Sequence, residues 1–150
     1  MSNALMCDDQ VTTLPSGVVF RNGDLIIEST ERWHRWAIQE LSQMALLSEG
    51  WDGDEAPKPA ALMLGNARGF VDFVSHQFAE LTSPCISLTP NSTVMLSWQK
   101  NDVSLDIEFQ SEHRLRYYYK NRKDNRRVPG TLHQRRLDST LPQLLTQFAT

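Results

Sequence analysis

The chain has 150 residues, of which 40% are hydrophobic and 22% are charged, and its formal net charge is -3. This length fits one domain that buries most of its apolar surface, and the composition excludes a disordered chain. No segment approaches the roughly 20 apolar residues of a membrane helix, so a membrane partner is not expected.

The N-terminal segment and the cysteines bear on localisation. Asp8 and Asp9 stand where a signal peptide would have a basic and then an apolar segment, so export is not expected. Cys7 and Cys85 are too few for a disulfide framework, which fits a reducing cytoplasm. We predict a cytoplasmic protein with a flexible tail at residues 1–12 and a single domain at residues 13–150.

The first expected elements are a hairpin and two long helices. Apolar residues at 18–20 and 25–27 flank Asn22-Gly23, which predicts a short β-hairpin. Apolar residues at steps of three and four predict one helix from about residue 29 to 48 and a second from about 59 to 81. Gly65 and Gly69 fall inside the second helix, where close packing would explain why they are tolerated.

From residue 86 onward apolar residues recur at every second position instead of at steps of three and four, which predicts strands. Three strands form a meander, and a fourth at residues 85–88 lies at its edge. The register that keeps every apolar set on one face puts Glu108 opposite Arg116 on the outer surface, and Tyr118 also points outward. We expect a basic loop at residues 120–127 and a short last helix, which Ser139 or Thr140 would cap.

These elements predict an α+β fold in which an antiparallel sheet of about four strands packs on helices, with a short N-terminal β-hairpin. No internal repeat or second-domain linker is visible in the sequence.

The charge is distributed unevenly along the chain. Residues 1–113 hold six Lys and Arg and sixteen Asp and Glu, a net charge of -10, whereas residues 114–150 hold nine and two, a net charge of +7. Such a polarity predicts a basic edge at residues 114–136 that binds an acidic partner, either nucleic acid or protein. Mutual neutralisation of the two halves is the alternative.

Basic and aromatic side chains alternate in this edge. Guanidinium groups bind phosphate, and tyrosines stack on bases, so the mixture suits a single-stranded or RNA-like ligand. The candidate binding residues are Arg116, Tyr118, Lys120, Arg122, Lys123, Arg126, Arg127, Arg135 and Arg136.

The run GWDGDEAPKP, residues 50–59, is the most distinctive in the chain. It resembles a motif of small bacterial proteins in which Gly-Trp-Asp-Gly is followed by a residue pair and Ala-x-Pro; no activity follows from the resemblance. The pair there is often Tyr-Gly, whereas here it is Asp54-Glu55. The run is also explained as a helix connector, in which Trp51 fills the gap between the helices, Asp52 bonds the backbone and Gly53 supplies a positive φ.

Two sets of carboxylates suggest a metal-dependent hydrolase or nuclease as an alternative. Asp52, Asp54 and Glu55 crowd on one loop, but their spacing is not that of an EF-hand. Asp106 and Glu108, with Lys120 on the next strand, suggest a metal nuclease, although Glu108 lacks a lysine two residues on.

The histidines are scattered without zinc-site spacing, and no nucleophile elbow or phosphate loop is present. We therefore predict neither a metal nor a cofactor. The leading hypothesis is a non-enzymatic binding or regulatory protein of bacterial or mobile-element type, which docks its basic edge on an acidic partner. A metal-dependent hydrolase and a homodimeric structural module remain as alternatives.

Overall fold

The computed structural model describes residues 18–21, 24–27, 29–78, 80–110, 113–133 and 139–149, with side chains described from residue 33 onward. Its elements in chain order are β1 (Val18–Arg21), β2 (Asp24–Ile27), α1 (Ser29–Met44), α2 (Ala61–Gln77), β3 (Cys85–Leu88), β4 (Val94–Lys100), β5 (Val103–Phe109), β6 (Arg114–Asn121), β7 (Arg126–His133), α3 (Thr140–Leu145) and a final 3₁₀ turn, η3 (Thr146–Phe148).

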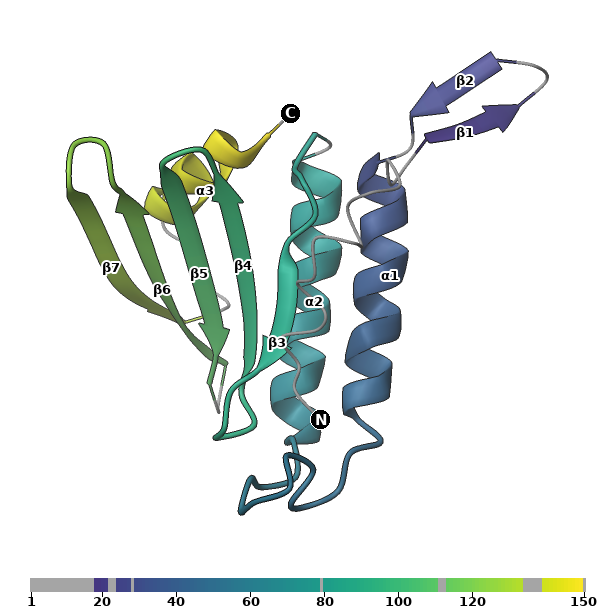
Figure 1. Cartoon of the computed structure of the whole chain (residues 1–150), viewed down its shortest axis with the longest axis vertical. Coiled ribbons are helices and arrows are strands. Elements are labelled where there is room, and N and C mark those ends of the chain that lie inside the picture. The colour runs from purple at the N-terminus through teal and green to yellow at the C-terminus, as the bar shows by residue number, and fades with distance from the viewer. Residues whose placement is uncertain are drawn as a thin grey trace.

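The architecture is α+β, as predicted, with an antiparallel sheet in the order β3-β4-β5-β6-β7 (Figure 1). The sheet has five strands, so the expectation of four is wrong. The added strand is β7, which takes in Arg126 and Arg127 from the predicted loop and leaves a turn of residues 122–125. Pro129 lies within β7, which an edge strand tolerates because one side of it has no pairing partner.

Strands β1 and β2 pair antiparallel, with Val18 opposite Ile27. The predicted turn residues Asn22 and Gly23 lie outside the described residues. The N-terminal hairpin therefore stays a prediction.

The two long helices are shorter than predicted. Helix α1 ends at Met44 rather than near residue 48, and α2 begins at Ala61 rather than at Pro59. Gly50 has the positive φ, 77°, that the predicted connector requires. A Cβ built on Gly65 would meet nothing within 4 Å, so close packing does not account for this glycine.

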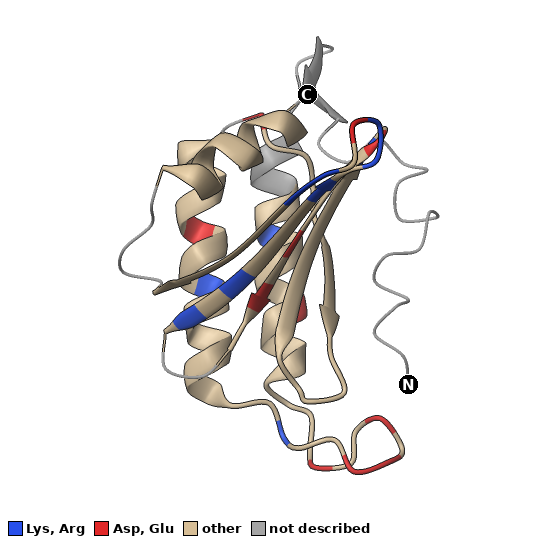
Figure 2. Ribbon diagram, turned by 90° about the vertical axis from the view of Figure 1, so that its left-hand side faces the viewer, with Lys and Arg blue, Asp and Glu red and all other residues tan. Residues whose placement is uncertain are grey.

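Helices α1, α2 and α3 lie on the same side of the sheet (Figures 1 and 2). Strand residues that face the helices are buried together with the apolar stripes of the helices. Two indole N–H groups anchor this core to the chain that follows α2, because Trp33 donates to the Leu81 carbonyl at 3.0 Å and Trp98 to the Thr82 carbonyl at 2.7 Å. Ser139 stands at the N-cap position of α3, and its side chain makes no capping hydrogen bond.

Cys85 begins β3 and is disulfide-bonded. A disulfide is not what a reducing compartment favours, so the cytoplasmic location stays a prediction.

Among the described helices, none has the length and apolar character needed to cross a membrane.

Candidate functional site

No described helix covers the sheet face turned away from α1, α2 and α3 (Figure 2). Strand pairing arranges its side chains in rows. One row runs Met95, Glu108, Arg116, Thr131, and the next runs Ser97, Asp106, Tyr118, Pro129. The predicted outward direction of Tyr118 is confirmed, because this side chain is 38% exposed. We call this surface the outer face.

Basic residues gather on β6, on β7 and in the turn between them (Figure 2). Residues 114–133 hold seven Lys and Arg and one acid, Asp124. Five of the seven side chains have no ion pair with any described residue: Arg114, Lys120, Arg122, Lys123 and Arg127. In the described part of the chain, the acidic half therefore does not neutralise these cations.

Strand β7 separates two residues that were predicted to act together. Arg127 lies opposite Lys120 on the outer face, whereas the Arg126 guanidinium lies 5.8 Å from the ring centre of Tyr119, whose side chain is buried. Arg126 thus has a packing role that Arg127 lacks. Arg135 and Arg136 lie outside the described residues.

Glu108 and Arg116 form the predicted cross-strand pair. The Arg116 Nη2 donates to Glu108 Oε1 at 2.5 Å, and Thr93 Oγ1 donates to Glu108 Oε2 at 2.6 Å. Glu108 is only 8% exposed, whereas the Arg116 side chain is 60% exposed. The carboxylate therefore holds Arg116 in place while the rest of the guanidinium faces solvent.

Two hollows flank this ion pair. The larger, of about 760 Å³, lies between the connector that precedes α2, the β3–β4 turn and the ends of β5 and β6. Lys58 and Arg114 line it together with Arg116. The smaller, of about 530 Å³, extends from Arg116 across Tyr118 to Pro129. Because Glu108 and Arg116 line both hollows, the two are neighbours on the outer face.

The connector motif builds one wall of the larger hollow. Trp51 Nε1 donates to Ser92 Oγ at 2.7 Å, and Ser92 Oγ donates in turn to the Pro57 carbonyl. Trp51 is partly buried against the core and its indole bonds to the β3–β4 turn, and the prediction that it fills the gap between the helices stays a prediction. This contact ties the connector to the sheet and places Lys58 on the rim.

Inside the connector, Asp52 acts as predicted for a structural loop. Its Oδ1 accepts the backbone N–H groups of Asp54 at 2.9 Å and Ala56 at 3.3 Å. Gly53 has φ 83°, as the turn requires. One of the three carboxylates of the cation hypothesis is therefore engaged by the loop's own backbone.

The residues of the nuclease hypothesis lie on the adjacent strands β5 and β6, but Glu108 is already engaged by other side chains. Both oxygens of Glu108 already accept hydrogen bonds, and Lys120 lies opposite Ser104 rather than Asp106. In the part of the chain that the structure describes, no group of three His, Cys, Asp or Glu side chains could hold a metal ion. Asp106 has no hydrogen bond or ion pair with a described residue.

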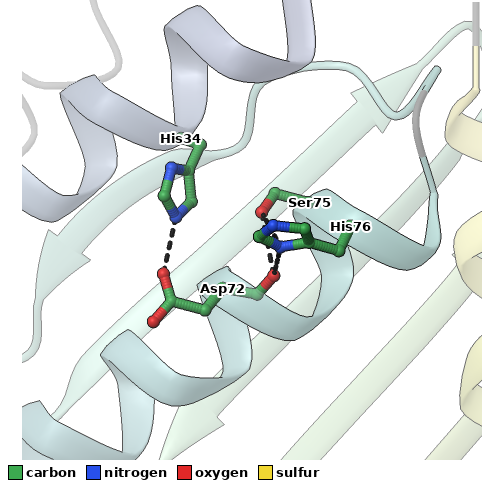
Figure 3. Close-up of polar contacts among 4 residues, drawn as sticks. All are labelled: His34, Asp72, Ser75 and His76. Carbon is green, nitrogen blue, oxygen red and sulfur yellow. Dashed lines mark hydrogen bonds and ion pairs between the residues drawn. The ribbon is translucent and has the colours of Figure 1, made fainter.

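A polar cluster joins α1 to α2 (Figure 3). His34 Nε2 donates to Asp72 Oδ1 at 2.5 Å, and His76 Nδ1 donates to the Asp72 carbonyl at 2.7 Å. Ser75 Oγ lies 3.5 Å from His76 Nδ1, whereas the Asp72 carboxylate binds His34. The groups thus do not form a nucleophile, base and acid in series, and they serve as a bridge between helices.

Sequence reasoning missed several residues of this site. Lys58 and Thr93 reach the outer face through contacts between distant segments, which no local pattern predicts. The His34–Asp72 pair depends on how α1 packs on α2. Elsewhere on α1, burial raises the pKa of the Glu40 carboxyl above its ordinary value.

Comparisons of the chain with protein-family models, with curated proteins and with solved structures found no match.

Proposed function

We propose that this chain is a non-enzymatic binding protein that docks the outer face and the β6–β7 turn on a nucleic acid. The observation that carries the proposal is the set of five cations on β6, β7 and their turn that have no ion pair with any described residue. Unpaired Lys and Arg side chains on one surface bind phosphates and release the counterions condensed on them.

The arrangement of the cations supports a polymer rather than a single small anion. Arg114, Arg116 and Lys120 lie on the same face of β6, and residues two apart on a strand are separated by roughly 7 Å. Lys58 extends the row at one end, and Arg122 and Lys123 extend it at the other. An extended polyanion meets such a row at several points.

The acidic groups near this surface support binding rather than hydrolysis. Glu108 is engaged by Thr93 and Arg116, and Asp52 is engaged by backbone N–H groups. An acidic protein surface is the competing partner. Such a surface is negatively charged, as a nucleic acid is, but it has no bases that could stack on Tyr118.

The test is the salt dependence of binding to single-stranded DNA, double-stranded DNA and RNA. The test variant replaces Arg122, Lys123 and Arg127 with Gln and leaves Arg126, which packs on Tyr119, in place. The plot of log affinity against log salt has a negative slope, and each phosphate contact contributes about 0.7–0.9 to its steepness. Loss of three contacts should therefore make the slope shallower by about 2–3.

Arg68→Gln is the matched control, because Arg68 is exposed on α2 and likewise has no ion pair with a described residue. Its slope should equal that of the unmodified protein. Absence of binding at low salt would overturn the proposal and direct attention to an acidic protein. An unchanged slope in the triple variant would overturn the assigned surface.

A further inference from the structure

We infer that the smaller hollow binds one unpaired base that carries an amino group, so that the partner is single-stranded; this inference rests on the proposed function. The hollow of about 530 Å³ lies on the outer face beside Arg116 and has room for a base. Its lining combines an apolar floor with two carboxylates, Asp106 and Glu108, and one cation, Arg116.

The floor is suited to a planar aromatic group. Tyr118 lies opposite Pro129 on β7, and Met95 lines the same hollow from β4. Tyr118 is exposed, and neither a hydrogen bond nor a ring contact joins it to another described residue. An exposed tyrosine that has no such partner among the described residues, and that lies between Arg116 and Lys120 on β6, offers its ring for stacking with a base.

Asp106 is the feature that a phosphate site alone does not explain. It lies directly opposite Tyr118 and has no hydrogen bond or ion pair with a described residue. A carboxylate in this place repels phosphate, but it accepts the N–H groups of a base edge. Carboxylates pair in this way with the N4 amino group of cytosine, whereas thymine offers only O4 at the corresponding position.

Arg116 completes the arrangement at the other side of the hollow. Glu108 holds one edge of its guanidinium, and the exposed remainder is free to bind the phosphate that follows the stacked base. In a duplex both faces of each base are stacked on neighbouring bases, so a base must leave the stack before its ring can lie on Tyr118. The hollow therefore selects an unpaired strand.

Binding to oligo(dC) and oligo(dT) of about ten nucleotides, a length within the range of known single-strand sites, tests the inference. Tyr118→Ala should weaken binding of oligo(dC) by about 5- to 150-fold, because it removes stacking, while Tyr118→Phe should retain it. Asp106→Asn should reduce the preference for oligo(dC) over oligo(dT), because it weakens the acceptor for the amino group, whereas removing a charge that repels phosphate acts on both strands alike.

The outcomes separate this inference from the proposed function. Tyr118→Ala and the unmodified protein could bind oligo(dC) with equal affinity while the triple variant still has a shallower salt slope. That result would overturn the base site and leave the proposed function intact. Equal affinity of the unmodified protein for oligo(dC) and oligo(dT) would overturn the role of Asp106. Absence of all binding at low salt would overturn both proposals.

Discussion

The inner and outer faces of the sheet are formed by alternate residues of the same strands, yet their side chains make opposite kinds of contact. Trp98, Ile107 and Tyr119 point to the helices and are at most 1% exposed. Asp106 and Tyr118 lie one position away on the same strands and have no hydrogen bond or ion pair with a described residue. Successive side chains of a strand point to opposite faces of the sheet. The inner residues therefore stabilise the fold, and the outer residues are available for binding.

Glu108 is the exception among the residues of the outer face. It points outward by register but is nearly as buried as the core, because Thr93 and Arg116 close over its carboxylate. A buried, bonded carboxylate on an otherwise open face costs more to remove than an exposed ion pair.

The largest effect is expected on the inner face. Trp98→Ala removes a buried indole and its hydrogen bond to the Thr82 carbonyl, and should lower the free energy of unfolding by about 3–5 kcal/mol. Urea unfolding measures the loss. Tyr118→Ala on the outer face is the control, with an expected change within about 0.5 kcal/mol. Equal losses in the two variants would contradict the division between faces.

Glu108→Gln should have the next largest effect, a loss of about 1–3 kcal/mol, because the amide replaces a charged acceptor of two hydrogen bonds. Asp106→Asn makes the same chemical change on the same strand and face without breaking a contact to a described residue, and should stay within about 0.5 kcal/mol. If the two variants unfold at the same urea concentration, Glu108 is not the buried anchor described above.

The smallest effect has the opposite sign and lies away from both faces. Gly65→Ala should raise the free energy of unfolding by about 0.5–1 kcal/mol, since Gly65 is exposed within α2 and a Cβ meets no atom there. Gly130→Ala is the contrast, because its Cβ would clash with two ring carbons and the hydroxyl oxygen of Tyr117. A lower melting temperature for Gly65→Ala would contradict the open environment assigned to this glycine.

The parts of the fold that were predictable are those governed by local periodicity. The period of two sufficed to place Glu108 opposite Arg116 and to turn Tyr118 outward. Strand β7 was missed because Pro129 and Gly130 interrupt its pattern and its inward residues are only half-buried. The bond from Trp51 to Ser92 spans 41 residues of sequence, and the pair of His34 with Asp72 spans 38, so neither has a local signal.

The central claim, that the outer face rather than the helices binds nucleic acid, is tested most directly by amide chemical-shift mapping with oligo(dC) at low salt. We expect the shifts to concentrate at Arg116, Tyr118 and Lys120 and in the turn at residues 122–125, with little change along the exposed side of α2. Shifts confined to α1 and α2, or spread evenly over the chain, would contradict the account.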